Sequence, residues 1–260
     1  IFVLISINPT ITSYLYQTPG FIPSIGFRLL SFFLSIILVL AFHGIGLLTC
    51  SVISLKTFPK HMAFPSRFFI GYLISSLAVY FLGFSRMLHK EIFIIVIILG
   101  IFISIHKIGG ITYKILFLIE NLKKENFEKG VIILIGVFLV GRLFPILNFN
   151  SFGDPLNYNL PAGRDYLQSE GFKWFEHAEF YWQAGLSDIG LIYLHSLNNH
   201  PMVVQLTAQS FYYLTGTLFL LLILHKGLFS KFVPEKHSLW ITFSFIAMGK
   251  FRLESIVAKP

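Results

Sequence analysis

The chain alternates long apolar runs with shorter polar segments that are rich in lysine and arginine. A transmembrane helix needs about 20 mostly apolar residues, and several of the runs approach or exceed that length. We expect membrane-spanning helices over six segments: 29–55, 68–84, 92–105, 131–147, 202–224 and 239–251. The pattern therefore predicts an all-α fold, a polytopic transmembrane helical bundle.

Lysine and arginine cluster in three of the loops between these segments, and short cytoplasmic loops of membrane proteins carry an excess of both residues. The clusters are Lys56, Lys60 and Arg67; Lys107, Lys114, Lys123, Lys124 and Lys129; and Lys226, Lys231 and Lys236. All three loops can be cytoplasmic at once. The longest polar loop, residues 148–200, then falls on the non-cytoplasmic side. We expect the functional residues to lie in this loop.

Composition agrees with this interpretation. Hydrophobic residues make up 55% of the chain and charged residues 12%, against about 45–50% and about 25% in ordinary soluble domains. The net charge of +8 comes from the separate basic loops rather than from one patch, so nucleic acid is not an expected partner. Membrane lipid is the expected partner, and we expect a multi-pass protein of the bacterial inner membrane. The single Cys50 lies in an apolar run and can form no internal disulfide.

The external loop is expected to contain two amphipathic juxtamembrane helices. The first would begin at Pro155 and lie flat on the membrane surface, with a break or restart at Pro161. The second would run over residues 187–198. The positions expected on one face are Leu156, Leu160, Gly163 and Leu167 in the first helix, and Ile189, Ile192, Tyr193 and Ser196 in the second.

Three short stretches of this region carry a family resemblance. They are Asp154-Pro155-Leu156-Asn157-Tyr158-Asn159-Leu160-Pro161, Tyr166-Leu167 and Asn199-His200-Pro201-Met202. Together they resemble the first external loop of GT-C membrane glycosyltransferases, in the branch of the protein-mannosyltransferase and aminoarabinose-transferase types. The resemblance covers about residues 131–260. It implies transfer of a sugar from a polyprenyl-phosphate carrier to a glycan, lipid or protein acceptor on the non-cytoplasmic side.

The resemblance divides the chain in two. Residues 1–130 would form amino-terminal transmembrane helices with a basic cytoplasmic loop, and residues 131–260 would start the catalytic module. At least three spans precede the aspartate, whereas the best-known members of the family have one. We expect the sequence to be the amino-terminal part of a longer transferase. The alternatives are an inactive fragment or accessory membrane subunit and, less favoured because paired broken helices are not evident, a transporter or flippase.

Asp154 is the expected catalytic residue. The resemblance implies that it is the general base, which takes the proton from an acceptor hydroxyl and must therefore lie within hydrogen-bond reach of it. An aspartate directly before a proline is also a good helix N-cap. The two roles are compatible.

Five residues are expected to bind substrate. Arg142 and Arg164 are candidates for holding the carrier phosphate, because guanidinium groups bind phosphate oxygens in pairs; the alternatives are snorkelling to the interface for Arg142 and pairing with nearby acids for Arg164. Tyr158 would stack on a sugar or belong to the aromatic belt of the interface. Asn159 stands where many relatives carry histidine. His200 would bind substrate or form the turn before Pro201.

Other polar residues yield weaker expectations. Glu176, His177 and Glu179 offer metal-ligand types without a recognised spacing, so no metal site is assigned, although some family members use a divalent ion. Gln205, Thr207 and Gln209 should face other helices, where they would join helices together or line a groove for the carrier. His43 is expected to be packed or hydrogen-bonded inside the bundle. No cofactor is assigned.

Overall fold

The computed structural model describes residues 25–55, 58, 62–108, 137, 160–172, 191–218, 231–233, 237–238 and 241. Within these residues every regular element is a helix, and none of the described positions lies in a β-strand. The all-α part of the prediction is therefore confirmed for this part of the chain. The predicted spans at 131–147 and 239–251 lie outside it except at single positions.

Three long helices form the first half of the fold: α3 (Ile25–Val52), α4 (Ala63–Phe84) and α5 (Lys90–Ile108). Each covers a predicted span and begins a few residues before it. Pro65 lies in the first turn of α4, where its missing N–H removes no helical hydrogen bond. Among the described residues, α3 and α4 are long and apolar enough to cross a membrane, judged by length and composition.

The helices α3, α4 and α8 (Leu160–Gln168) end in the same backbone motif. The second residue beyond each helix has a positive φ: Ser54 at 54°, Arg86 at 56° and Glu170 at 57°. At the end of α4 the Met87 N–H donates to the Leu82 carbonyl at 2.9 Å, and the Arg86 N–H donates to the Gly83 carbonyl at 3.3 Å. This is the Schellman arrangement. Glycine usually occupies its left-handed position, which costs other residues roughly 1–2 kcal/mol.

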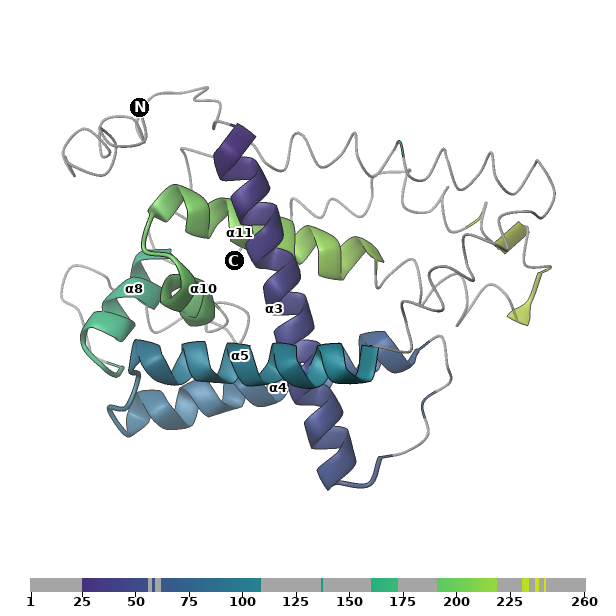
Figure 1. Ribbon diagram of the computed structural model, residues 1–260, viewed down its shortest axis with the longest axis horizontal. Helices are drawn as coiled ribbons and strands as arrows, with labels where there is room; N and C mark the ends of the chain where they lie inside the picture. The colour runs from purple at the N-terminus through teal and green to yellow at the C-terminus, as the bar shows by residue number, and fades with distance from the viewer. Residues whose placement is uncertain are drawn as a thin grey trace.

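Glycines bring α3 into direct backbone contact with α4 and α5. A Cβ added to Gly44 would overlap with the Gly100 carbonyl of α5, and a Cβ added to Gly71 of α4 would overlap with the Phe42 carbonyl and lie 2.6 Å from the Gly46 nitrogen. Figure 1 shows α3 lying across the α4–α5 pair at this place. Small residues at crossings of this kind let helices approach closely, as in the packing of membrane helices.

The second half of the fold contains α8, α10 (Leu191–Leu197) and α11 (Pro201–Tyr213), which continues into the π-helical turn η3 (Leu214–Leu218). Pro201 is well placed at the start of α11, because the first turn needs no N–H from it. The predicted surface helices are therefore present in part, and the first one begins at the expected restart near Pro161. Residues 155–159 and 187–190 lie outside the described residues.

The helix α10 differs from the expected surface helix. Its side chains from Ile192 to Ser196 are all buried, at 1–4% exposure. It contacts α5, α8 and α11, so neighbouring helices cover it on every side. The expectation of one buried face and one exposed face was wrong for α10. By contrast, α8 is amphipathic: Ala162 and Tyr166 are buried, whereas Arg164 and Gln168 are exposed.

The core is centred on Phe42 of α3. Its ring makes edge contacts with four other rings, at centroid distances of 5.3–6.3 Å: Phe68, Tyr72, Tyr193 and Phe211. These rings come from α4, α10 and α11. Perpendicular aromatic pairs of this kind are favourable beyond their buried area. The core therefore joins α10 to the long helices through one aromatic cluster.

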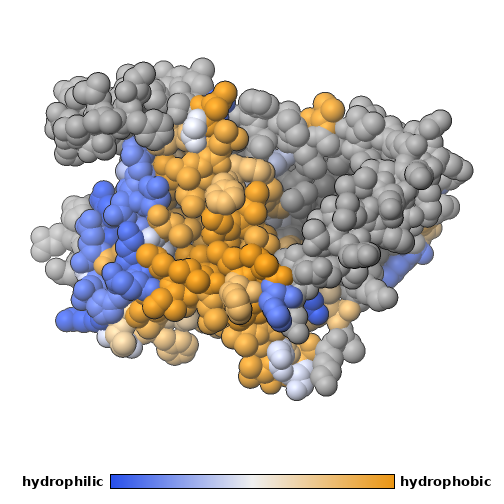
Figure 2. All heavy atoms as spheres, in the orientation of Figure 1, coloured by the Kyte–Doolittle hydropathy of each residue, from blue (hydrophilic) through white to orange (hydrophobic). Residues whose placement is uncertain are grey.

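The outer surface of the long helices is apolar. Figure 2 shows a hydrophobic belt over α3, α4 and α5, with hydrophilic residues gathered at the end where the α4–α5 turn and α8 lie. Phe81, Phe84 and Phe102 are 74%, 77% and 70% exposed within this belt. Exposed apolar area of this extent is rare on soluble monomers and marks a surface that contacts lipid or another protein.

Candidate functional site

Two of the six predicted site residues, Arg164 and His200, lie among the described residues. Asp154, Arg142, Tyr158 and Asn159 lie outside them, so their predicted roles stay predictions. The described neighbourhood of the site consists of α8, α10 and the first turn of α11, together with the parts of α3, α4 and α5 that contact them.

Arg164 lies on the exposed side of α8. Its Nε donates to Oδ1 of Asp165 at 2.9 Å, and the Arg164 side chain is 48% exposed. The expected alternative of pairing with a nearby acid is therefore observed. Arg164 is half exposed and Asp165 is 12% exposed, and the contact does not test the predicted phosphate role.

His200 occupies the N-cap position of α11, with extended backbone angles. Its backbone N–H donates to Oδ1 of Asn198 at 2.8 Å, and its ring stacks on Phe27 of α3 at 5.2 Å between centroids. The turn role expected for His200 is thus observed. Burial lowers the pKa of His200, because a buried ring loses hydration of its charged form. Burial therefore disfavours the charged form of this imidazole.

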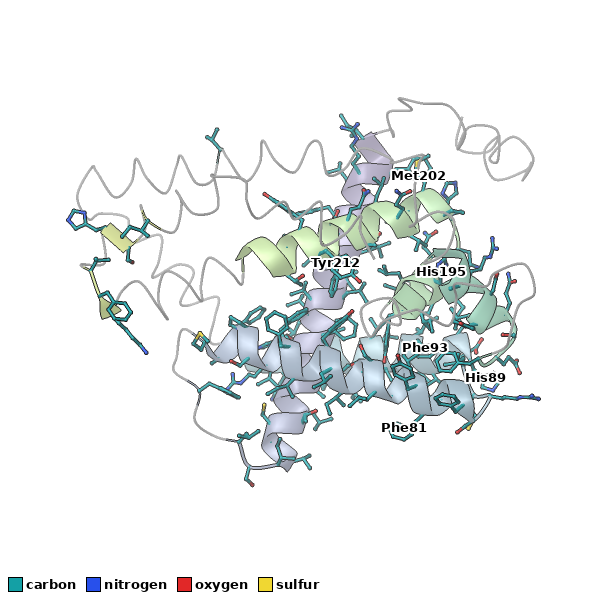
Figure 3. The ribbon with its side chains drawn as sticks, turned by 180° about the vertical axis from the view of Figure 1, so that it is seen from behind. Phe81, His89, Phe93, His195, Met202 and Tyr212 are labelled. Carbon is teal, nitrogen blue, oxygen red and sulfur yellow. The ribbon has the colours of Figure 1, made fainter. Side chains whose placement is uncertain are left out.

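His195 and Gly163 bring α8 and α10 together. A Cβ added to Gly163 would lie 3.0 Å from Cδ2 of His195, which is 3% exposed. Glycine at this position lets the imidazole of α10 rest directly on the backbone of α8. In Figure 3, His195, His89 and Phe93 all lie toward the same end of the molecule.

Tyr193 is a residue that sequence reasoning did not single out for the site. Its hydroxyl donates to the Ser75 carbonyl of α4 at 3.3 Å, and its ring packs at 5.0 Å from Phe93 of α5. Burial raises the pKa of Tyr193 to about 12. The 3.6-residue pattern placed Tyr193 on one face of the helix but did not indicate its partners Ser75 and Phe93, because these lie 118 and 100 residues earlier in the chain.

The turn between α4 and α5 contacts the end of α8 through the backbone. The Leu88 N–H donates to the Glu170 carbonyl at 2.9 Å, and the Phe172 N–H donates to the Gly83 carbonyl at 3.1 Å. Nδ1 of His89 lies 3.4 Å from Oε1 of Glu170. The end of α8 is therefore attached to the long helices by two hydrogen bonds and by the contact between the His89 ring and the Glu170 carboxylate.

Polar side chains inside the bundle face other helices, as expected. Gln205 and Thr207 are 2% and 1% exposed, and the Thr207 hydroxyl donates to the Val203 carbonyl at 2.6 Å. Nδ1 of His43 lies 3.0 Å from the Ser104 hydroxyl of α5, and its ring stacks on Phe64 at 4.2 Å. His43 is thus packed and hydrogen-bonded. Among the described residues, no group of three acidic, histidine or cysteine side chains is placed to hold a metal ion.

The α4–α5 turn, α8 and α10 lie at one end of the α4–α5 pair, which α3 crosses (Figure 1). The first turn of α3 contacts the start of α11 through the stack of Phe27 on His200. Comparisons with protein-family models, with curated proteins and with solved structures yield no match to this chain.

Proposed function

We propose that the chain is a multi-pass protein of the bacterial inner membrane, with α8, α10 and the start of α11 on the non-cytoplasmic side. The apolar belt over α3, α4 and α5 supports this proposal. So does the glycine packing at the helix crossings.

The contacts at the ends of the helices also support this topology. The basic segment that follows α3 carries Lys56 and Lys60 and should be cytoplasmic. The opposite end of α3 contacts α11, because the Ser31 hydroxyl donates to the Val203 carbonyl at 3.3 Å. The α4–α5 turn, which should lie on the same side as the start of α3, contacts the end of α8. Segments that the charge pattern assigns to one side are thus in contact with one another.

A thiol-labelling experiment tests this topology. With Cys50 replaced by serine, single cysteines are placed at Arg164 and at Lys231, which are both exposed. A membrane-impermeant maleimide added to intact spheroplasts should label R164C and leave K231C unlabelled until the membrane is opened. Labelling of both positions in intact spheroplasts, or of K231C alone, would contradict the proposed topology.

We further propose that the protein is a GT-C glycosyltransferase that uses a polyprenyl-phosphate sugar. The observation that carries this proposal is contact between the helices that adjoin the first and third stretches of the resemblance. The helix α8 starts at Leu160, near the end of the first stretch, and His200 of the third stretch starts α11. Both helices contact α10 and each other. A site formed from these stretches needs such contact.

In the proposed reaction, Asp154 accepts the proton of the acceptor hydroxyl while that oxygen attacks the anomeric carbon of the sugar. The bond between the anomeric carbon and the phosphate oxygen breaks, and the polyprenyl phosphate leaves with the electron pair. The configuration at the anomeric carbon inverts. Arg142 or Arg164 would neutralise the phosphate of the carrier, since charge-assisted hydrogen bonds to phosphate are strong.

The proposed function is tested by Asp154→Asn in the full-length protein, with Asp188→Asn as the matched control in the same loop. Membranes are incubated with undecaprenyl phosphate carrying radiolabelled mannose, glucose or galactose, and transfer to endogenous acceptors is measured. Loss of a general base should lower transfer by about 10²- to 10⁴-fold, while the control stays near the unmodified protein. Full transfer by Asp154→Asn, or no transfer of any of these sugars by the unmodified protein, would overturn the proposal.

A further inference from the structure

A polar cluster of His43, Arg67 and Ser104 joins the three long helices, toward the ends of α4 and α5 that lie away from the α4–α5 turn. Nδ1 of His43 on α3 lies 3.0 Å from the hydroxyl of Ser104, in the last turns of α5. Arg67, which the sequence pattern placed in a loop, lies in the second turn of α4. The cluster therefore lies between helices rather than beyond their ends.

Gly46 of α3 brings Arg67 to this cluster. A Cβ added to Gly46 would overlap with the Arg67 carbonyl, so the two backbones touch one helical turn from His43. Phe64, three residues before Arg67 and thus on the same side of α4, stacks on the His43 ring at 4.2 Å between centroids. The charge of Arg67 acts on that ring. Arg67 is therefore held beside His43 by the packing of α4 on α3.

The charge of Arg67 is not balanced by a carboxylate within the described ranges. The acidic residues there are Glu91, Asp165 and Glu170, which lie at the start of α5, on α8 and just beyond α8. These positions are near the α4–α5 turn, at the other end of α4. The first turn of α4, where an acidic residue would be favoured by the helix dipole, contains none.

The guanidinium of Arg67 is also incompletely hydrogen-bonded. Its Nε is buried and has no hydrogen-bond partner in the part of the chain that the structure describes, although the residue as a whole is partly exposed. Ionisable side chains inside membrane helices are rare, and they mark functional sites unless they are paired. Snorkelling hydrates the exposed part of such a side chain but supplies no counter-charge. The cluster therefore fits a ligand that brings an anion to the exposed side of Arg67.

Exposed apolar side chains occupy the same or neighbouring turns of the three helices. Leu48 of α3 is 45% exposed, Phe69 of α4 is 49% exposed and Ile105 of α5 is 57% exposed. A ligand that combines an anion with long hydrocarbon chains can therefore contact Arg67 and this apolar surface at once. A small anion in water would use the first of these contacts alone.

The charge pattern indicates the source of such a ligand. Lys56 and Lys60 lie in the segment between α3 and α4, which places this end of the helices on the cytoplasmic side in the proposed topology. The cytoplasmic leaflet contains anionic lipids, and basic sites between transmembrane helices on this side bind their headgroups.

We propose that Arg67 binds the phosphate of an anionic phospholipid of the cytoplasmic leaflet, whose acyl chains lie on the apolar surface of α3, α4 and α5. His43, fixed by Ser104 and Phe64, forms the wall against which the guanidinium is held. The inference rests on the proposed membrane location and topology and does not depend on transferase activity. The bound lipid neutralises Arg67 and contacts all three helices, so it stabilises their crossing.

Thermal unfolding of the full-length protein in detergent tests the site. Phosphatidylglycerol and phosphatidylcholine with the same acyl chains are added in parallel, and the melting temperature is measured by size-exclusion fluorescence. Phosphatidylglycerol well above its Kd should raise the melting temperature by roughly 5 °C, whereas phosphatidylcholine should not. Arg67→Gln should lose this difference. The matched control Arg86→Gln removes an exposed arginine just beyond the other end of α4 and should retain it.

Three results would overturn the proposal. The first is an equal shift with both lipids in the unmodified protein. The second is a shift by phosphatidylglycerol that Arg67→Gln retains, or that Arg86→Gln loses to the same extent, since the effect would then not belong to Arg67. The third is an equal shift with inorganic phosphate, which would assign the site to a free anion.

A photo-crosslinking experiment on the unmodified protein covers the case in which Arg67→Gln fails to accumulate. Phosphatidylglycerol with a diazirine on one acyl chain should label peptides from residues 63–69 and 103–108 more than peptides from residues 81–90. Equal labelling of both ends overturns the site. Maleimide labelling that contradicts the topology would refute the leaflet assigned to the lipid, and the lipid-dependent melting shift would still decide whether Arg67 binds a phospholipid.

Discussion

The hydroxyl of Tyr193 donates to the backbone carbonyl of Ser75 at 3.3 Å and so joins the loop helix α10 to the middle of α4. Tyr193 is 2% exposed, and its ring packs against Phe42 and Phe93. The residue therefore enters the space between three long helices and carries its polar atom to a partner there. Tyr193 therefore connects α10 to all three long helices.

Tyr193→Phe should destabilise the protein by about 1 kcal/mol, since it removes one hydrogen bond and retains the ring. Tyr193→Ala should cost about 3–5 kcal/mol, because it leaves a large cavity among the aromatic rings. Both values can be measured by denaturant unfolding in detergent, followed by tyrosine or tryptophan fluorescence. Equal losses in the two variants would contradict the packing described for the ring.

The stability of the protein should fall at high pH because of Tyr193. Burial raises its folded-state pKa from 10.0 to about 12. Above pH 10 the unfolded state releases this proton while the folded state retains it, so the contribution is complete below pH 10 and is lost as the pH rises to 12. Tyr193→Phe should lack this component. Parallel pH profiles for the two proteins between pH 10 and 12 would show that Tyr193 is not the group responsible.

Gly71→Ala should destabilise the crossing of α3 and α4. The added methyl group would overlap with the Phe42 carbonyl, and overpacking of this kind costs about 1–3 kcal/mol. Leu73→Ala on the exposed side of the same helix is the control and should be nearly neutral by comparison. Melting temperatures in detergent, read by size-exclusion fluorescence, would separate the two variants. A higher melting temperature for Gly71→Ala would rule out the close crossing.

Glu170→Gly should stabilise the protein by about 1 kcal/mol, because glycine adopts a positive φ without the penalty that other residues incur. The contact with His89 that is lost with it is exposed, at 43% for His89 and 61% for Glu170, and even a charged pair with this exposure contributes little. Glu170→Gln keeps the strained backbone and should leave the unfolding free energy nearly unchanged. A destabilised glycine variant alongside a neutral glutamine variant would argue against backbone strain at this position.

The three long helices were predictable because an apolar run of about 20 residues can form few structures other than a long helix. Their ends were less predictable. The ends of α3 and α4 are set by Schellman motifs with Ser54 and Arg86 in the place where glycine is the usual signal. A serine or an arginine in that place does not mark a helix end in a sequence. The helix α4 ends at Phe84, as expected, but α3 ends three residues before and α5 three residues after the expected end, and the three helices begin two to five residues earlier than expected.

The environment of α10 was not predictable from its own sequence. Periodicity identified Ile192, Tyr193 and Ser196 as one face, and these residues are buried. It could not indicate that Leu194 and His195 on other faces are covered as well, because that depends on α8, α5 and α11 packing around the helix. The site itself was predicted from motif residues. Among them, Arg164 pairs with a neighbouring acid and His200 forms a turn, which are the alternatives to substrate binding that the sequence suggested.

The interlocked ends of α4 and α8 also bear on the order in which the chain acquires its structure. A ribosome completes the α4–α5 hairpin well before residues 160–172 emerge, because synthesis proceeds from the amino terminus. The loop thus meets a partner already in place, and the entropy lost on closing so long a loop grows only slowly with its length. Vectorial synthesis therefore favours assembly in which the early hairpin acts as the template and the later loop is the segment that adapts to it.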